Sequence, residues 1–87
     1  KNSNFFLQHF SSNNKKLASI WLLENSNKIK NCKIIKLKSA KEGDYYFAII
    51  SGPYKSIDEA SEYKKNNLIA EKSWIRPARR LIEQVIF

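Results

Sequence analysis

A run of seven residues near the middle of the chain, 45–51 (YYFAIIS), limits the fold more than any other feature of the sequence. Six of its side chains are apolar or aromatic. Aromatic and β-branched residues favour strands, and a near-continuous apolar run is typical of a strand in the centre of a sheet. Gly52 and Pro53 follow, and we expect the strand to end there because proline cannot donate to a central ladder. The chain is therefore expected to be built around a β-sheet.

Patterns on both sides of this run predict the other elements of one small domain. Short apolar stretches predict strands at 5–10, 32–38 and 73–76, and helical patterns predict helices at 15–25, 57–66 and 78–86. The predicted fold class is α+β, a four-stranded, largely antiparallel sheet (βαββαβ, RNP-like) with helices on one face and an extra C-terminal helix. With 87 residues there is room for one such domain, which we assign to residues 4–86 after a three-residue tail.

Side-chain alternation divides the predicted sheet into two faces. In the first strand, Phe5, Leu7 and His9 alternate with Phe6, Gln8 and Phe10. In the central strand, Tyr46 points to the other side of the sheet from Phe47 and Ile49. In the last strand, Trp74 and Arg76 share a side with Lys72. We expect the helices to cover one face, the first of them through a stripe of Leu17, Ile20 and Trp21. The other face would then be open, with Gln8, Tyr46 and Trp74 on it.

The composition argues against several classes of function. His9 and Cys32 are the only histidine and cysteine, so the chain offers neither a disulfide framework, a zinc ligand set nor a catalytic triad. No glycine-rich phosphate loop occurs either. We expect no enzymatic activity, no cofactor and no metal, and we interpret His9 as a buried residue bonded to a neighbour. Because the chain lacks methionine and begins at Lys1, we expect a piece of a longer protein, with any membrane anchor outside it.

Four segments, taken in order, resemble the SPOR domain family. Phe6-Leu7-Gln8 followed by Ser11-Ser12-Asn13 resembles the family's opening strand and turn. Residues 46–54 (YFAIISGPY) resemble its third strand with a Gly-x-aromatic exit. Ser56-x-x-Glu59-Ala60 resembles the start of its second helix, and residues 74–77 (WIRP), followed by a helix with Gln84, are similar to the end of such domains. The resemblance covers almost the whole chain.

This resemblance implies non-catalytic binding of bacterial peptidoglycan. SPOR domains favour glycan strands without stem peptides, which gather at the division septum, and they lie on the periplasmic side of cell-envelope proteins. The implied glycan site is on the open sheet face, where Gln8 and Ser11 match polar positions and Tyr46 and Trp74 match aromatic positions. The expected partners are peptidoglycan glycan strands, with divisome or peptidoglycan-remodelling proteins as further candidates.

The chemistry of the side chains adds Arg76 to these candidates. Amidase action leaves a free lactyl carboxylate on each muramic acid, so a stripped strand is a polyanion, and an arginine can pair with such a carboxylate bidentately. The rings of Tyr46 and Trp74 offer apolar planes for the C–H faces of sugars. The amide of Gln8 can both donate and accept hydrogen bonds.

Two other functions stay open at this point. A net charge of +8, aromatic residues and the strand order are compatible with an RRM-like binder of single-stranded nucleic acid. The central strand, however, has no RNP1-like octamer, and we expect no nucleic-acid partner. A protein-interaction domain that docks an envelope enzyme would use the same sheet face or the terminal helix at 78–86.

Overall fold

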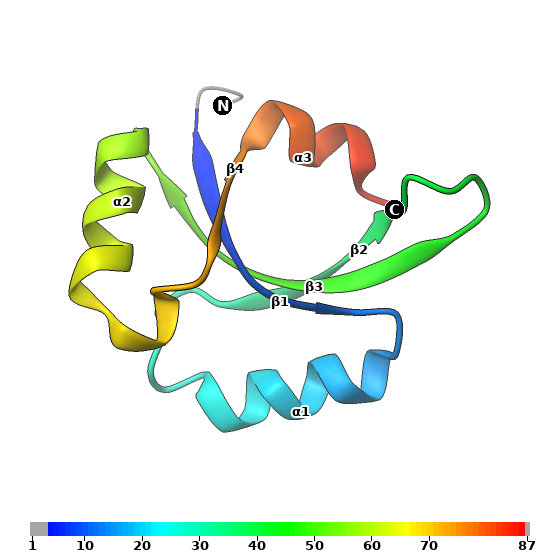
Figure 1. The fold of residues 1–87 in the computed structure, drawn as a ribbon, viewed down its shortest axis with the longest axis horizontal. Helices are drawn as coiled ribbons and strands as arrows, with labels where there is room; N and C mark the ends of the chain where they lie inside the picture. Colours follow the sequence, from blue (N-terminus) through cyan, green and yellow to red (C-terminus); the bar gives the residue numbers. More distant parts are fainter. Residues whose placement is uncertain (1–3, 87) are drawn as a thin grey trace.

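Four antiparallel strands form one sheet in the order β2-β3-β1-β4 in the computed structural model, which describes residues 4–86 (Figure 1). The strands are β1 (Phe5–Ser12), β2 (Lys33–Lys38), β3 (Tyr45–Tyr54) and β4 (Trp74–Pro77). The helices are α1 (Lys15–Asn25), α2 (Ile57–Asn66), α3 (Ala78–Gln84) and a short 3-10 helix, η1 (Leu68–Ala70). The predicted βαββαβ order with a C-terminal helix is confirmed. The predicted tail, residues 1–3, lies outside the described residues.

Helices lie on both faces of the sheet, and Figure 1 shows α1 and α3 on opposite sides of the strands. On the first face, Leu7 and Tyr54 pack with Ala60 of α2; we call this the α1–α2 face. On the second, Leu37, Ala48 and Ile50 pack with Leu81 of α3, and we call it the α3 face. The face expected to be open is therefore crossed by the C-terminal helix, because Leu81 buries its side chain there.

The central strand continues past the point where it was expected to end. β3 runs through Gly52 and Pro53 to Tyr54, which pairs with Phe5 of β1. The register of the two strands shifts between Phe5 and Leu7, so Pro53 has no ladder partner in β1. The prediction that Gly52 and Pro53 end the strand was wrong, because this irregularity removes the need for a proline N–H.

A bulge in β1 changes the predicted alternation of its side chains. The pairing with β3 shifts between Gln8 and Phe10, and both His9 and Phe10 stack on Trp21 of α1, with ring centroids 6.2 and 5.6 Å away. Phe10 therefore lies on the α1–α2 face and not, as predicted, on the side of Gln8. Ser11, which pairs with Ala48, returns to the α3 face. The extra residue thus lets Gln8 and Ser11 share a face.

The buried stripe of α1 differs from the predicted one. Ala18 and Asn25 are buried with Trp21 half-buried between them, whereas Leu17 and Ile20 are exposed. The stack of Trp21 on β1 orients the helix, and the small Ala18 lies one turn away on the same side. The helix begins after Asn14, whose Oδ1 accepts hydrogen bonds from the backbone N–H groups of Lys16 (2.9 Å) and Leu17 (3.3 Å).

The buried environment of His9 predicts a loss of stability in acid. Burial lowers the pKa of His9 from its ordinary 6.5 to about 4; its Nε2 lies 2.7 Å from Ser51 Oγ, and its Nδ1 has no partner among residues 4–86. The unfolded chain therefore takes up a proton before the folded one does, and stability falls as the pH drops from 6.5 towards 4. Because the ring is only partly buried, we expect a loss on the order of 1–2 kcal/mol.

Urea unfolding at pH 7 and pH 4.5 measures this loss. His9→Leu is the control, because the carboxylates of the chain titrate in both proteins and only the histidine term differs. Equal losses of unfolding free energy in the two proteins would contradict the prediction.

Candidate functional site

The five predicted site residues all come from strands and lie on the α3 face. Gln8 and Ser11 belong to β1, Tyr46 to β3, and Trp74 and Arg76 to β4. Gln8 pairs with Trp74 across the β1–β4 ladder, and Arg76, two residues further along, lies on the same side. The structure brings Gln8, Trp74 and Arg76 together. Ser11 and Tyr46 lie at the other end of the face.

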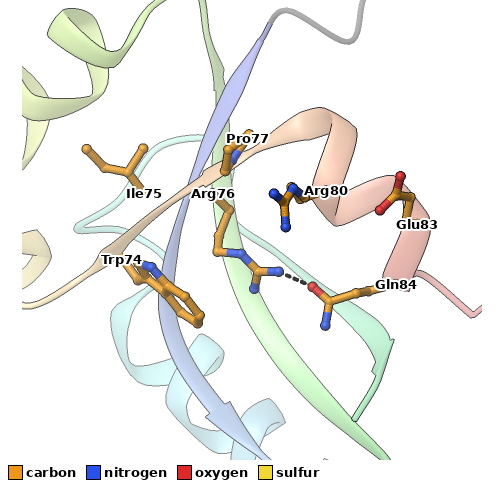
Figure 2. A pocket seen from close by; sticks show the side chains of 7 residues that line it. All are labelled: Trp74, Ile75, Arg76, Pro77, Arg80, Glu83 and Gln84. Atoms are coloured by element: carbon orange, nitrogen blue, oxygen red, sulfur yellow. Dashed lines mark hydrogen bonds between the residues drawn. The ribbon is translucent and has the colours of Figure 1, made fainter. Parts of the chain in front are cut away.

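The guanidinium of Arg76 is held between two glutamine side chains. Arg76 is 6% exposed, and its Nη1 donates to Gln8 Oε1 (2.5 Å). Its Nη2 donates to Oε1 of Gln84 in α3, the bond drawn as a dashed line in Figure 2. The Nε2 of Gln84 in turn donates to the carbonyl of Lys38 in β2 (3.2 Å). We call Arg76 with its two glutamines the Arg76 clasp. It connects β1, β4, α3 and β2.

The hydrogen-bond partners of this buried cation are neutral. Buried charges in proteins are generally paired with an opposite charge, yet Gln8 and Gln84 contribute only amide oxygens. The ring of Trp74 adds a cation–π contact, with the Arg76 Cζ 4.6 Å from its centroid. A guanidinium has five N–H donors, so Arg76 keeps donor capacity for a further acceptor. The local chemistry favours an anion.

A cleft opens beside the clasp, between the last strand and α3. Its volume is about 440 Å³, and its lining residues are Trp74, Ile75, Arg76, Pro77, Arg80, Glu83 and Gln84. We call it the β4–α3 cleft (Figure 2). Trp74 is 60% exposed there, so its ring offers an apolar plane next to arginine and amide donors. Such a combination of an aromatic plane and a few polar groups is typical of ligand sites.

Three polar residues of this cleft were not predicted as site residues from the sequence, namely Arg80, Glu83 and Gln84. Their spacing of three and four residues places them on one side of α3. That spacing can be read from the sequence. The sequence does not show on which face of the sheet α3 lies, so these residues could not be assigned to the site.

Tyr46 and Ser11 occupy a separate part of the α3 face. Tyr46 is half-buried against the Leu37 and Leu81 cluster and lines a second cleft of about 420 Å³ with Asn13, Ser39, Asp44 and Tyr45. Ser11 is exposed but lines neither cleft. Gln84 lies between the two clefts, because it lines the first and bonds to Lys38, the neighbour of Ser39.

Gln8 and Lys72 have different surroundings from those expected. Gln8 was expected to be bare on the open face, but it is 8% exposed and its Oε1 is occupied by Arg76. It therefore positions the guanidinium. Lys72 belongs to the turn before β4 and does not line the β4–α3 cleft.

The structure is a small α+β domain with a cleft beside its C-terminal helix, lined by cationic and aromatic side chains. No protein-family model matches the sequence, and no curated protein shows a significant match to it. Within residues 4–86, none of the helices combines the length and the apolar character that crossing a bilayer requires. The same residues contain no group of three histidine, cysteine, aspartate or glutamate side chains placed to hold a metal ion.

Proposed function

We propose that this domain is a SPOR-like module that binds glycan strands of bacterial peptidoglycan without changing them chemically. The observation that carries the proposal is Trp74, a ring 60% exposed at the mouth of the β4–α3 cleft on the sheet face opposite α1 and α2. The βαββαβ order and the segment resemblance to SPOR domains support the same assignment.

The cleft has groups suited to a carbohydrate. The apolar C–H face of a sugar ring can lie on the indole of Trp74, while amide and guanidinium groups bond to hydroxyl, acetamido or carboxylate oxygens. Its volume of about 440 Å³ is within the range of small-ligand sites. The second cleft lies at the start of β3, beside Tyr45 and Tyr46, and could hold the continuation of a strand.

The preferred ligand in this proposal is a strand that lacks stem peptides. The domain would then direct a cell-envelope protein to the division septum, from the periplasmic side, where divisome or peptidoglycan-remodelling proteins are further partners. The ligand preference, the septal location and the further partners follow from the SPOR resemblance. The proposed binding site is the β4–α3 cleft.

Replacing the exposed ring tests the proposal. Trp74→Ala is expected to weaken binding to purified sacculi about tenfold, which corresponds to the loss of one aromatic contact. Co-sedimentation of the 87-residue chain with amidase-treated sacculi measures the effect. Leu23→Ala is the matched control, because Leu23 is an exposed apolar residue (81%, against 60% for Trp74) on α1, across the sheet. Unchanged sedimentation of a folded Trp74→Ala variant would refute the proposal.

Single-stranded nucleic acid is the second candidate ligand. An exposed Trp74 beside Arg76 and Arg80 could stack a base and contact phosphates, and the chain carries a net charge of +8. Titration with oligonucleotides at increasing salt distinguishes the two ligands. If the protein binds oligonucleotides with an affinity that falls steeply with salt, and does not bind sacculi, the nucleic-acid assignment replaces the glycan assignment.

A further inference from the structure

We infer that the β4–α3 cleft is a carboxylate receptor, in which Arg76 binds a free carboxylate of the glycan and Gln84 holds that place when no ligand is bound. This inference rests on the proposed glycan function and adds to it the group that the site recognises. For a peptidoglycan strand, that group is the lactyl carboxylate of a muramic acid.

The first support is the state of Arg76. Its guanidinium is buried, and its partners Gln8 and Gln84 are neutral amides. Each amide oxygen accepts one N–H of the guanidinium: Gln8 accepts from Nη1 and Gln84 accepts from Nη2. A carboxylate in the place of the Gln84 oxygen would accept two N–H groups and supply the opposite charge that the amide lacks.

The second support is the charge around the cleft. Its lining contains two arginines, Arg76 and Arg80, against one glutamate, Glu83. The net positive lining favours an anion, most strongly at Arg76, because the burial of its side chain reduces the screening of its charge by solvent. Arg80, on α3, lines the same cleft as Arg76, and Figure 2 shows both side chains among those that line it.

The third support is the position of Gln84 at the end of its helix. Gln84 is the last residue of α3, whereas the buried residues of this helix are Ala78 and Leu81. The Gln84 side chain can therefore leave Arg76 without unpacking the helix. In the present arrangement its Nε2 donates to the carbonyl of Lys38 (3.2 Å).

Recognition of a carboxylate gives the site a chemical means of selecting stripped strands. While the stem peptide is attached, the lactyl carbonyl is part of a neutral amide; once it is removed, a charged carboxylate takes its place. The stem peptides themselves end in carboxylates, so the same chemistry has a second source. A test must separate the two.

Binding of four ligands to the 87-residue chain, measured by calorimetric titration, provides that test. The ligands are amidase-treated glycan oligomers with free lactyl carboxylates, the same oligomers with these groups converted to primary amides, peptide-bearing oligomers, and neutral chitotetraose. We expect the free-acid oligomers to bind about tenfold more tightly than the amidated ones, the difference made by one charge-assisted pair. We expect the peptide-bearing oligomers to resemble the amidated form.

A substitution at Gln84 tests the clasp directly. Gln84→Glu places a carboxylate of the chain itself on Arg76, and we expect the preference for free-acid oligomers to disappear while the fold is kept. Gln84→Ala leaves Arg76 available, so the preference should persist. Arg79→Gln is the charge control, because it lowers the net charge equally at an exposed position of α3 outside the cleft lining.

The outcomes separate the inference from the function on which it rests. Equal affinity for free-acid and amidated oligomers, or a preference that survives Gln84→Glu, would overturn the carboxylate receptor and leave glycan binding standing. Peptide-bearing strands that bind as tightly as free-acid strands would overturn the lactyl assignment. Failure of every glycan to bind would remove the proposed function and the inference with it.

Discussion

Leu81→Ala is expected to lower the free energy of unfolding by about 2–4 kcal/mol, the usual cost of a cavity in a packed core. Leu81 is 3% exposed and packs with Leu37, Ala48 and Ile50 on the α3 face. It is the larger of the two buried side chains, Ala78 and Leu81, of a helix of only seven residues. Its truncation should therefore loosen α3 as a unit and, with it, the wall of the β4–α3 cleft.

Hydrogen exchange distinguishes local loosening from a uniform loss of stability. The amide of Val85 bonds to the carbonyl of Leu81 (3.1 Å), and that of Ile86 bonds to Lys36 in β2 (2.9 Å). These two amides should lose protection first in the variant. Ile82→Ala is the control on the same helix, since Ile82 is 51% exposed and its truncation should cost less than about 1 kcal/mol. Similar costs for the two substitutions would contradict this account of α3.

Gly52→Ala is expected to destabilise the protein by about 3 kcal/mol, through backbone strain and overpacking together. Gly52 has a φ of +128°, which side-chain-bearing residues rarely adopt, and a Cβ there would lie 3.1 Å from the Phe5 carbonyl oxygen. The same Cβ would lie 3.1 Å from Phe6 and 3.2 Å from Tyr54. The close approach of β1 and β3 at this irregularity therefore depends on the missing side chain.

Gly43→Ala provides a comparison within the same chain. Gly43 also has a positive φ, +88°, but a Cβ there would have no neighbour within 4 Å. Only the conformational term remains, and we expect a cost of about 1 kcal/mol. Urea unfolding of both variants measures the difference, which isolates the steric contribution at Gly52. Equal costs would show that the contacts of Gly52 with β1 do not matter.

The elements of the fold could be predicted because their signals are local. Ser56, the N-cap of α2, accepts a hydrogen bond from the Glu59 N–H (3.0 Å), and α2 spans the predicted residues 57–66. The apolar run in β3 likewise identified the central strand, which lies between β2 and β1. A helix N-cap and an apolar run depend on residues that are close in the sequence, so one sequence is enough to predict them.

The parts of the site that were missed depend on long-range packing. The bulge at His9 is invisible to a period-two pattern, and it decides that Phe10 faces α1 while Ser11 does not. The placement of α3 on the second face was equally hidden. That placement buries Gln8 and brings Gln84 to Arg76. Trp74 and Arg76, by contrast, could be paired from their spacing in one short strand.

The Gln8–Arg76 hydrogen bond joins residues 68 positions apart in a chain of 87. Bringing such distant segments together costs loop-closure entropy, and native pairings of this kind form late compared with local ones. A ribosome must therefore release nearly the whole sequence before the guanidinium can be held in place. If the domain binds glycan as proposed, the β4–α3 cleft would become competent only when its first and last strands have met.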